Sequence, residues 1–311
     1  GRPPGPRTML RLDRFMSIYI FSALMRLKQE NFNCSISILM YHSISEDEEK
    51  GIAPYYRINT SPSRFREHMR YLKEKGWHII SLTQAIALCQ TPREKLPLPS
   101  PLEGRIAALT FDDGYEDFLT GAMPVLQDFG YPATIFLPTG FIGKKARAKF
   151  KGKPCLTWEE VRTLSRCGVE LGSHTVTHRR LCELPWPEVI GELKGSKQVI
   201  EDETGRPVHH FSFPFAYPVD KKWVSVFKSE LAACGYVSCA TTKAGRHPLS
   251  QDPFSLKRLP INDLDDLQFF EAKLYGAYDW VSALQALYKG LKLWLSAEGR
   301  DGLRLGGLLK K

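Results

Sequence analysis

The sequence lacks the features that would assign it to several common protein classes. Its seven cysteines form no CxxC pair and no regular framework, and an odd number cannot pair completely within one chain. We therefore expect reduced thiols. The apolar stretch 17–25 is much shorter than the roughly 20 residues that a membrane-spanning helix needs, and no small-residue cleavage site follows it, so a secretory signal has little support. A chain of 311 residues with 43% hydrophobic content instead predicts an ordinary globular protein.

Positive charge is in excess, since the formal net charge is +9. Such an excess favours an anionic partner, but many of the basic residues lie near the two ends of the chain, where a solvated end is the simpler explanation. We therefore expect no nucleic-acid partner. A helix over residues 9–27 would lie either on a membrane surface or on the rest of the protein. A cytoplasmic or membrane-peripheral protein is expected, with the cell envelope as the alternative.

Short apolar runs alternate with amphipathic stretches through most of the chain, which predicts successive βα units. Seven or eight strands, each followed by a helix or a long loop, predict a distorted parallel (β/α) barrel, in which chemistry lies where the strands end. The expected strands are residues 36–42, 77–81, 106–113, 133–137, 169–172, 211–215, 236–240 and 256–261.

Helical patterns fill the gaps between these strands. Ser63 and Thr157 are the expected N-caps of helices over residues 63–75 and 157–167, and a further helix is expected over 187–204. A last helix, over residues 279–294, would pack an apolar stripe on the barrel; the alternative is that this stripe contacts a membrane. That stripe consists of Leu284, Leu287, Tyr288, Leu291 and Trp294.

The chain is expected to have three parts. Residues 1–35 form a basic and amphipathic N-terminal segment, residues 36–275 form the barrel, and residues 276–311 form an amphipathic helix with a basic tail.

The expected strand 106–113 ends in two carboxylates, Asp112 and Asp113, which Gly114 follows. Successive strand side chains point to opposite faces, so both acids serve one site only if the strand ends there, and Gly114 permits the necessary turn. Two buried acids repel each other, and a divalent cation would relieve that repulsion. The alternative is that Asp113 caps a helix over residues 116–129.

A second strand end carries His174 and His178, four positions apart. If this turn is helical, both imidazoles share one face with Cβ atoms roughly 6 Å apart, which suits two nitrogens on one metal ion. Taken alone, such a pair is more often structural. Together with Asp112 and Asp113 at another strand end, it predicts a catalytic Zn²⁺ site, or a site for another divalent metal, with one position open for water.

The segments TFDDGY (110–115) and SHTVTH (173–178) closely resemble the first two motifs of the polysaccharide deacetylases, the NodB-like carbohydrate esterases. The resemblance extends from residue 36 to residue 274 in the order of elements and implies a NodB-like barrel. It implies that Asp113, His174 and His178 hold the metal and that Asp112 is the general base. It also implies that the amide of Tyr115 helps to hold the oxyanion.

These roles agree with the chemistry of amide hydrolysis. The metal acidifies its water and polarises the acetamide carbonyl, while a carboxylate takes the proton. The departing amine needs an acid, which the family usually supplies as a histidine in an LxH motif near the C-terminus. No such motif follows Ile261, but the early strand 36–42 ends in His42, as in members with permuted strands. We expect His42 to be the acid; the alternative is a histidine that only caps a strand end.

The segment FSFPFA (211–216) resembles the third family motif, except that Ser212 stands where the family has an arginine that orients the base. Arg258, at another expected strand end, is the candidate that supports Asp112 in its place.

Residues in and just after this motif are candidates for substrate contact. Pro214, Phe215 and Tyr217 are expected to bind the sugar, although aromatic residues near barrel strands belong more often to the core.

The sequence thus predicts a metal-dependent deacetylase that hydrolyses N-acetyl groups of amino sugars in a poly- or oligosaccharide. One alternative is an amidohydrolase acting on a small non-carbohydrate amide. Another is a catalytically inactive glycan-binding protein, which the missing arginine and LxH motif would favour. Retention of both Asp112 and Asp113 argues against it, because holding a metal does not require the base. No pattern in the sequence indicates the oligomeric state.

Overall fold

The computed structural model describes residues 11–28, 35–91, 105–143 and 146–290. The strands are β1 (Ser35–Tyr41), β2 (Ser43–Ile44), β3 (Asn59–Thr60), β4 (His78–Ile79), β5 (Ile106–Phe111), β6 (Thr134–Leu137), β7 (Lys149–Phe150), β8 (Lys153–Pro154), β9 (Glu170–Ser173), β10 (His210–Ser212), β11 (Ser238–Ala244), β12 (His247–Pro248) and β13 (Leu256–Pro260). The helices are α1 (Leu12–Phe15), η1 (Met16–Phe21), α2 (Ser22–Lys28), α3 (Pro62–Glu74), α4 (Leu82–Gln90), α5 (Met123–Phe129), α6 (Trp158–Arg166), α7 (Trp186–Thr204), α8 (Lys221–Ala233), α9 (Leu267–Leu274) and a stretch over 281–290.

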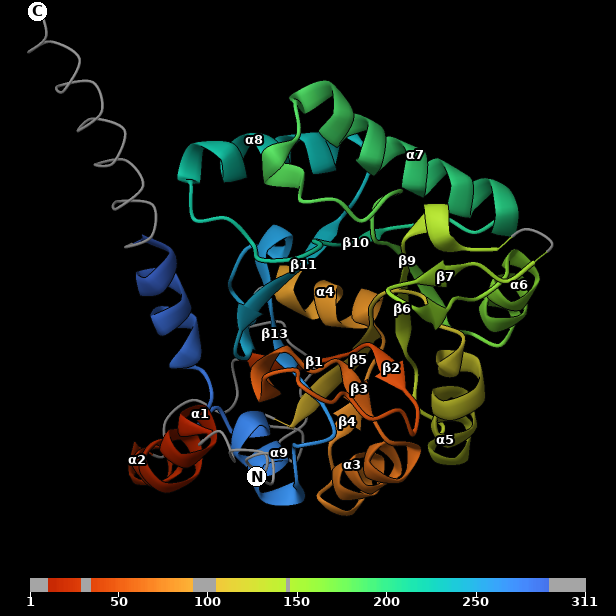
Figure 1. The fold of residues 1–311 in the computed structure, drawn as a ribbon. Coiled ribbons are helices and arrows are strands. Elements are labelled where there is room, and N and C mark those ends of the chain that lie inside the picture. Colours follow the sequence, from red (N-terminus) through yellow and green to blue (C-terminus); the bar gives the residue numbers. More distant parts are fainter. Residues whose placement is uncertain (1–10, 29–34, 92–104, 144–145, 291–311) are drawn as a thin grey trace, which may run out of the picture.

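Parallel strands close into a barrel at the centre of the molecule (Figure 1). The order around it is β1, β13, β11, β10, β9, β6 and β5, and β5 pairs again with β1 to complete the ring. Each neighbouring pair in this ring is parallel. The predicted parallel barrel is therefore confirmed. The N-terminal strand β1 lies between the central strand β5 and the last strand β13, which is the permuted arrangement.

Strand periodicity divides the core into an inner and an outer layer. Alternate residues, among them Ile36 and Ile38 of β1 and Ile106 and Ala108 of β5, form one buried cluster together with residues of α4. The intervening residues, such as Leu109, join the larger cluster under the outer helices. Helix α4 therefore packs against the interior at the amino ends of the strands, and polar side chains can gather at the carboxyl ends.

Helices α3, α5, α6, α7, α8 and α9 surround the barrel (Figure 1). Thr157 is the N-cap of α6, as predicted, and it forms a capping box, because the Thr157 side chain and the Glu160 side chain each bond the other residue's backbone amide. The predicted cap of α3 is wrong by two residues. Ser61 is the N-cap and Pro62 takes the first helical position, where a missing N–H costs nothing.

The predicted packing of the last helix is wrong for its described part. Leu284, Leu287 and Tyr288 are 51%, 71% and 68% exposed, whereas Leu291 and Trp294 lie outside the described residues. The stretch is held instead through Gln285, whose side-chain oxygen accepts a hydrogen bond from the Ala244 amide at 3.0 Å. The described residues of the stripe therefore face away from the barrel.

The N-terminal helical segment packs beside the C-terminal part of the chain. Phe21 stacks on Trp280 with ring centroids 5.1 Å apart, and Arg11 pairs with buried Asp265. Within the described residues, no helix is both long and apolar enough to cross a membrane. The division at residues 35 and 275 stays a prediction.

Candidate metal centre and active site

The DDG turn at the end of β5 directs two acids to one end of the barrel. Asp113 and Gly114 both adopt left-handed backbone conformations, with φ of 72° and 60°. The resulting turn allows Asp112 and Asp113, which are 3% and 1% exposed, to face the same region instead of opposite sides of a strand. Asp113 caps no helix; its carboxylate faces two histidines.

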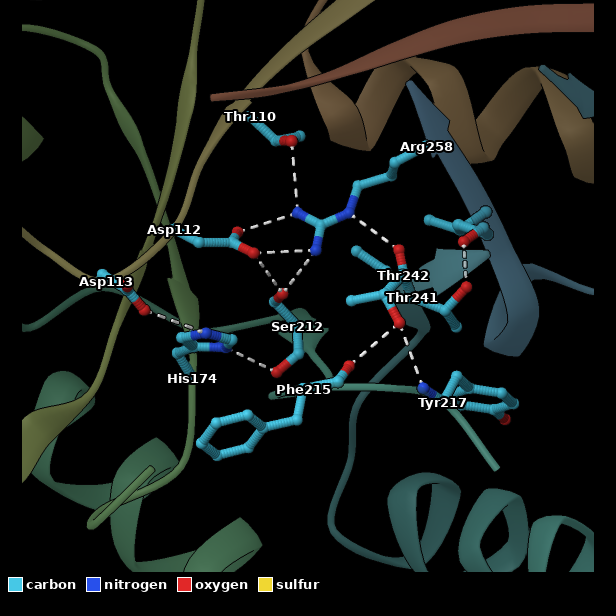
Figure 2. A network of polar contacts seen from close by, with 12 residues as sticks. Thr110, Asp112, Asp113, His174, Ser212, Phe215, Tyr217, Thr241, Thr242 and Arg258 are labelled. Carbon is cyan, nitrogen blue, oxygen red and sulfur yellow. Dashed lines mark hydrogen bonds and ion pairs between the residues drawn. The ribbon is translucent and has the colours of Figure 1, made fainter. Parts of the chain in front are cut away.

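The histidine turn after β9 is not helical, so the helical spacing considered for His174 and His178 does not apply. Thr175 and His178 adopt left-handed conformations, with φ of 70° and 52°. The turn still brings the two imidazoles together, with ring centroids of His174 and His178 4.7 Å apart. The carbonyl of Ser212 lies 2.7 Å from Nδ1 of His174, and because a carbonyl only accepts, Nδ1 carries the proton and Nε2 is left for a metal (Figure 2).

Glu192 of α7 holds the histidine turn from outside and was missed in the sequence. Its Oε2 accepts hydrogen bonds from the amides of Val176 and Thr177 at 2.7 and 2.9 Å, and its Oε1 accepts one from the Thr177 hydroxyl. No local pattern distinguishes this glutamate from the others of α7, because its role depends on the packing of α7 against the turn.

Asp113, His174 and His178 form a group that fits a metal ion. Their candidate donor atoms all lie within 4.8 Å of one another. Nε2 of His178 and Nε2 of His174 lie 3.2 and 3.5 Å from Oδ1 of Asp113. This oxygen is buried and has no hydrogen-bond partner of normal geometry within the described part of the chain. One carboxylate and two imidazoles are the donor set of many catalytic zinc sites.

The electrostatics of this group favour its metal-binding form. Burial would raise the pKa of Asp113, but the neighbouring His174 and His178 imidazoles hold it well below its usual range. Burial lowers the pKa of His178. An ionised carboxylate and a neutral imidazole are the protonation states that ligate a metal.

Arg258 reaches Asp112 through the interior of the barrel (Figure 2). Its two terminal nitrogens lie 2.8 Å from Oδ1 and 2.8 Å from Oδ2 of Asp112, a bidentate pair in which Arg258 is 1% exposed. Ser212 donates to Oδ2 of Asp112 at 3.2 Å and accepts from Arg258 at 3.0 Å. Burial raises the pKa of Asp112, but Arg258, together with the nearby His174 and His42, more than offsets this and brings it to about 2.

His42 and Tyr115 approach the same end of the barrel. His42 directly follows β1 and lies an even number of positions after Ile36 and Ile38, whose side chains point into the barrel, so its position is on the same inward face. Burial lowers the pKa of His42, and the negative charges of Asp113 and Asp112 act in the opposite direction.

The backbone of Tyr115 forms an isolated antiparallel β-bridge with that of Cys155. Its two hydrogen bonds run from the Glu116 amide to the Pro154 carbonyl and from the Leu156 amide to the Gly114 carbonyl. The Tyr115 amide is therefore not used by this bridge. Its phenol donates to Oδ2 of Asp113 at 3.0 Å.

The three predicted substrate contacts have different surroundings. Phe215 is 38% exposed, and its ring meets that of His178 edge-on, with centroids 4.8 Å apart. Pro214 is buried. Tyr217 is 1% exposed and packs on Phe213, so its ring belongs to the core and only Phe215 of the three offers a surface.

A hairpin formed by β7 and β8 brings one further residue to the site. Lys151, at its turn, places Nζ 3.2 Å from Oδ2 of Asp113. The Lys-Gly pair at 151–152 is a signal for a turn, but it does not indicate which element the turn will meet.

Strained backbone conformations are concentrated at this site. Every non-glycine residue with positive φ in the described part of the chain belongs to it or touches it. Such conformations cost on the order of 1–3 kcal/mol each and persist only where the surrounding structure imposes them. They are Asp113, Lys151, Thr175, His178 and Phe215.

Comparison with known proteins shows which proteins the segment that carries the two motifs is similar to. Residues 100–236 match the family model of the polysaccharide deacetylases. The chain is 28% identical over 227 residues to YxkH of Bacillus subtilis (strain 168), a protein assigned to the polysaccharide deacetylases, covering 73% of this chain and 71% of that protein. It is 33% identical over 146 residues to the poly-β-1,6-N-acetyl-D-glucosamine N-deacetylase of Escherichia coli (strain K12), covering 44% of this chain and 20% of the relative.

The fold agrees with these matches. The structure of the Streptococcus pyogenes deacetylase PplD in complex with acetate superposes with a TM-score of 0.65 at 22% identity, covering 77% of this chain and 98% of that one. Both predicted motifs, which end at Tyr115 and His178, lie within the matched segment. Residues 100–236 therefore resemble the polysaccharide deacetylases, as the two motifs predicted.

Proposed function

We propose that this protein is a metal-dependent deacetylase that removes N-acetyl groups from amino sugars of an oligo- or polysaccharide. The observation that carries the proposal is one ionised carboxylate, Asp112, next to a separate group of one carboxylate and two imidazoles. A protein that only binds a metal does not need this second carboxylate, nor the buried arginine that keeps it charged. The name of the Escherichia coli relative supports the amino-sugar substrate. The match covers a fifth of that relative's length.

Asp113, His174 and His178 would hold the metal, with Zn²⁺ or another divalent ion as the candidates. A metal bound there would supply a Lewis acid that polarises an amide carbonyl and acidifies water. Asp112 is the proposed base. Its ion pair with Arg258 keeps it ionised and oriented, so that it can accept a proton from the attacking water.

The remaining steps use residues on either side of these acids. The amide of Tyr115 is proposed to donate to the oxyanion that develops on the acetyl carbonyl. His42 is proposed to give a proton to the departing sugar nitrogen. Phe215 offers its exposed ring as an apolar surface for the sugar.

Acetate release from N-acetylglucosamine oligomers tests this function. Wild-type protein with Zn²⁺ is expected to release acetate, a chelator is expected to abolish the release, and Asp112→Asn is expected to lose at least about a hundredfold in rate while still binding Zn²⁺. Full release by Asp112→Asn would remove the proposed base. No release from any oligomer by metal-loaded protein would overturn the deacetylase and favour the small-molecule amidohydrolase or the inactive glycan-binding protein.

The finer expectations on partners and place stay predictions. An N-acetylated glycan is the proposed substrate. Peripheral membrane association depends on the N-terminal helical segment, where Leu12, Phe15 and Tyr19 are 63%, 49% and 58% exposed. Sedimentation of the protein with anionic vesicles, compared with a variant carrying Phe15→Ser and Tyr19→Ser, tests that association.

A further inference from the structure

The two oxygens of Asp113 have different partners. Oδ1 faces Nε2 of His174 and Nε2 of His178. Oδ2 lies on the other side of the carboxylate and accepts hydrogen bonds from the Tyr115 hydroxyl at 3.0 Å and from Nζ of Lys151 at 3.2 Å. The carboxylate is therefore held in an orientation that presents Oδ1, and not Oδ2, to the histidine side.

The hairpin that carries Lys151 is itself well fixed. Its turn consists of Lys151 and Gly152, both left-handed, with φ of 50° and 82°. Phe150, just before the turn, packs against the rings of Phe141 and His178 with centroids 4.5 and 4.8 Å apart. The bridge between Cys155 and Tyr115 joins the hairpin to the segment after β5.

The ion-pair partner distinguishes Lys151 from Lys153 of the same hairpin. Nζ of Lys153 is 2.6 Å from a carboxylate oxygen of Asp47, away from the histidines. Among the described residues, the carboxylate that pairs with Lys151 is Asp113. The side chain of Lys151 is 44% exposed, so a full positive charge stands at the mouth of the site, in contact with one proposed metal ligand.

We propose that Lys151 is a positioning residue that acts through Asp113 and sets the affinity of the site for its metal and the Lewis acidity of that metal. Together with the Tyr115 hydroxyl it fixes Oδ1 as the oxygen given to the metal, because a carboxylate held by hydrogen bonds on its outer oxygen cannot rotate freely. Its positive charge also reduces the donor strength of the Asp113 carboxylate and repels the metal cation that this carboxylate would hold. The site then holds its metal less tightly and leaves it a stronger Lewis acid. The inference rests on the proposed metal-dependent function.

The affinity of the full chain for Zn²⁺, measured by competition with a chromophoric chelator, tests the inference. Lys151→Met is expected to bind Zn²⁺ about tenfold more tightly than wild type, since a repelling charge is removed while Tyr115 still orients the carboxylate. Lys149→Met removes the same charge from an exposed position of the same hairpin and is expected to bind like wild type. Lys151→Arg keeps the charge and is expected to stay near the wild-type affinity.

Kinetics on N-acetylglucosamine oligomers add a second readout. Metal-loaded Lys151→Met is expected to lose about tenfold in kcat with KM unchanged, because the lysine acts through the metal ligand and not on the sugar. Unchanged or weaker Zn²⁺ binding by Lys151→Met would overturn the proposal, and so would a raised KM at unchanged Zn²⁺ affinity, which would place the lysine on the substrate. Wild-type protein that binds no Zn²⁺ would instead overturn the proposed metal-dependent function, and this inference with it.

Discussion

Asp112 keeps its charge in the barrel because one arginine side chain crosses the interior to meet it. Burial of an unpaired carboxylate is costly, and the bidentate pair with Arg258 supplies the compensating charge. In the family pattern this arginine belongs to the third motif, where this chain has Ser212. The Ser212 hydroxyl contacts both Asp112 and Arg258. In this chain the arginine that pairs with Asp112 therefore comes from β13 instead of from the third motif.

Replacing this arginine is expected to disable the base without removing the metal ligands. Arg258→Met leaves Asp112 buried and unpaired, which favours its protonated form and costs about 3–5 kcal/mol of stability. We expect kcat/KM for acetate release to fall at least about a hundredfold while Zn²⁺ binding persists.

A double variant provides the matched control for this prediction. Ser212→Arg combined with Arg258→Ser returns the guanidinium to the position that the family motif uses. Partial recovery of kcat/KM relative to Arg258→Met is expected, because the charge next to Asp112 is restored. Wild-type kinetics in Arg258→Met would show that Asp112 needs no cationic partner.

At the scale of elements, the histidine turn depends on α7, the next α-helix along the chain. Glu192 receives two amides and a hydroxyl of the turn, and these contacts hold Thr175 and His178 in left-handed conformations that they would not adopt alone. The metal ligands of this turn are thus oriented by α7.

Glu192→Leu is expected to loosen this turn and weaken metal binding. The amides of half-buried Val176 and exposed Thr177 lose their acceptor, and an amide that water does not then reach costs about 1–3 kcal/mol. Zn²⁺ affinity is expected to fall by about 10–100-fold, measured by chelator competition. Glu188→Leu is the control on the same helix, because its exposed carboxylate pairs with Arg179 and not with the turn. Equal Zn²⁺ affinities of the two variants would contradict this role of Glu192.

The strands were predictable from the sequence because both faces of a barrel strand are buried. The apolar runs that became β1 and β5 show this directly, and the acids after β5 followed from the same pattern. The inward direction of Arg258 was predictable in part, since it lies two positions after Leu256, an inward residue of β13, and therefore on the same face of the strand. The form of the histidine turn and the place of Lys151 were not predictable, because Glu192 and the β7–β8 hairpin determine them through contacts that no local pattern indicates.

Over the whole molecule, three buried histidines outside the metal group make the fold sensitive to acid. Burial lowers the pKa of His68, His210 and His247 to about 4. His68 lies between Tyr41 of β1 and the Asp265 carbonyl, whereas His210 bonds Thr83 at the start of α4. Protonation of these side chains would therefore act on several parts of the barrel at once.

The free energy of unfolding is expected to fall as the pH decreases from about 6.5 to about 4. In this range the unfolded chain binds protons at these histidines and the folded chain does not, so each contributes up to about 1.4 kcal/mol per pH unit, and the contribution is fully present only above the unfolded pKa. Urea unfolding at pH 7 and pH 5 measures the slope. His68→Gln is expected to make it shallower, whereas His78→Gln, at an exposed position of β4, serves as the control. An unchanged slope in His68→Gln would show that folding does not lower the pKa of this histidine.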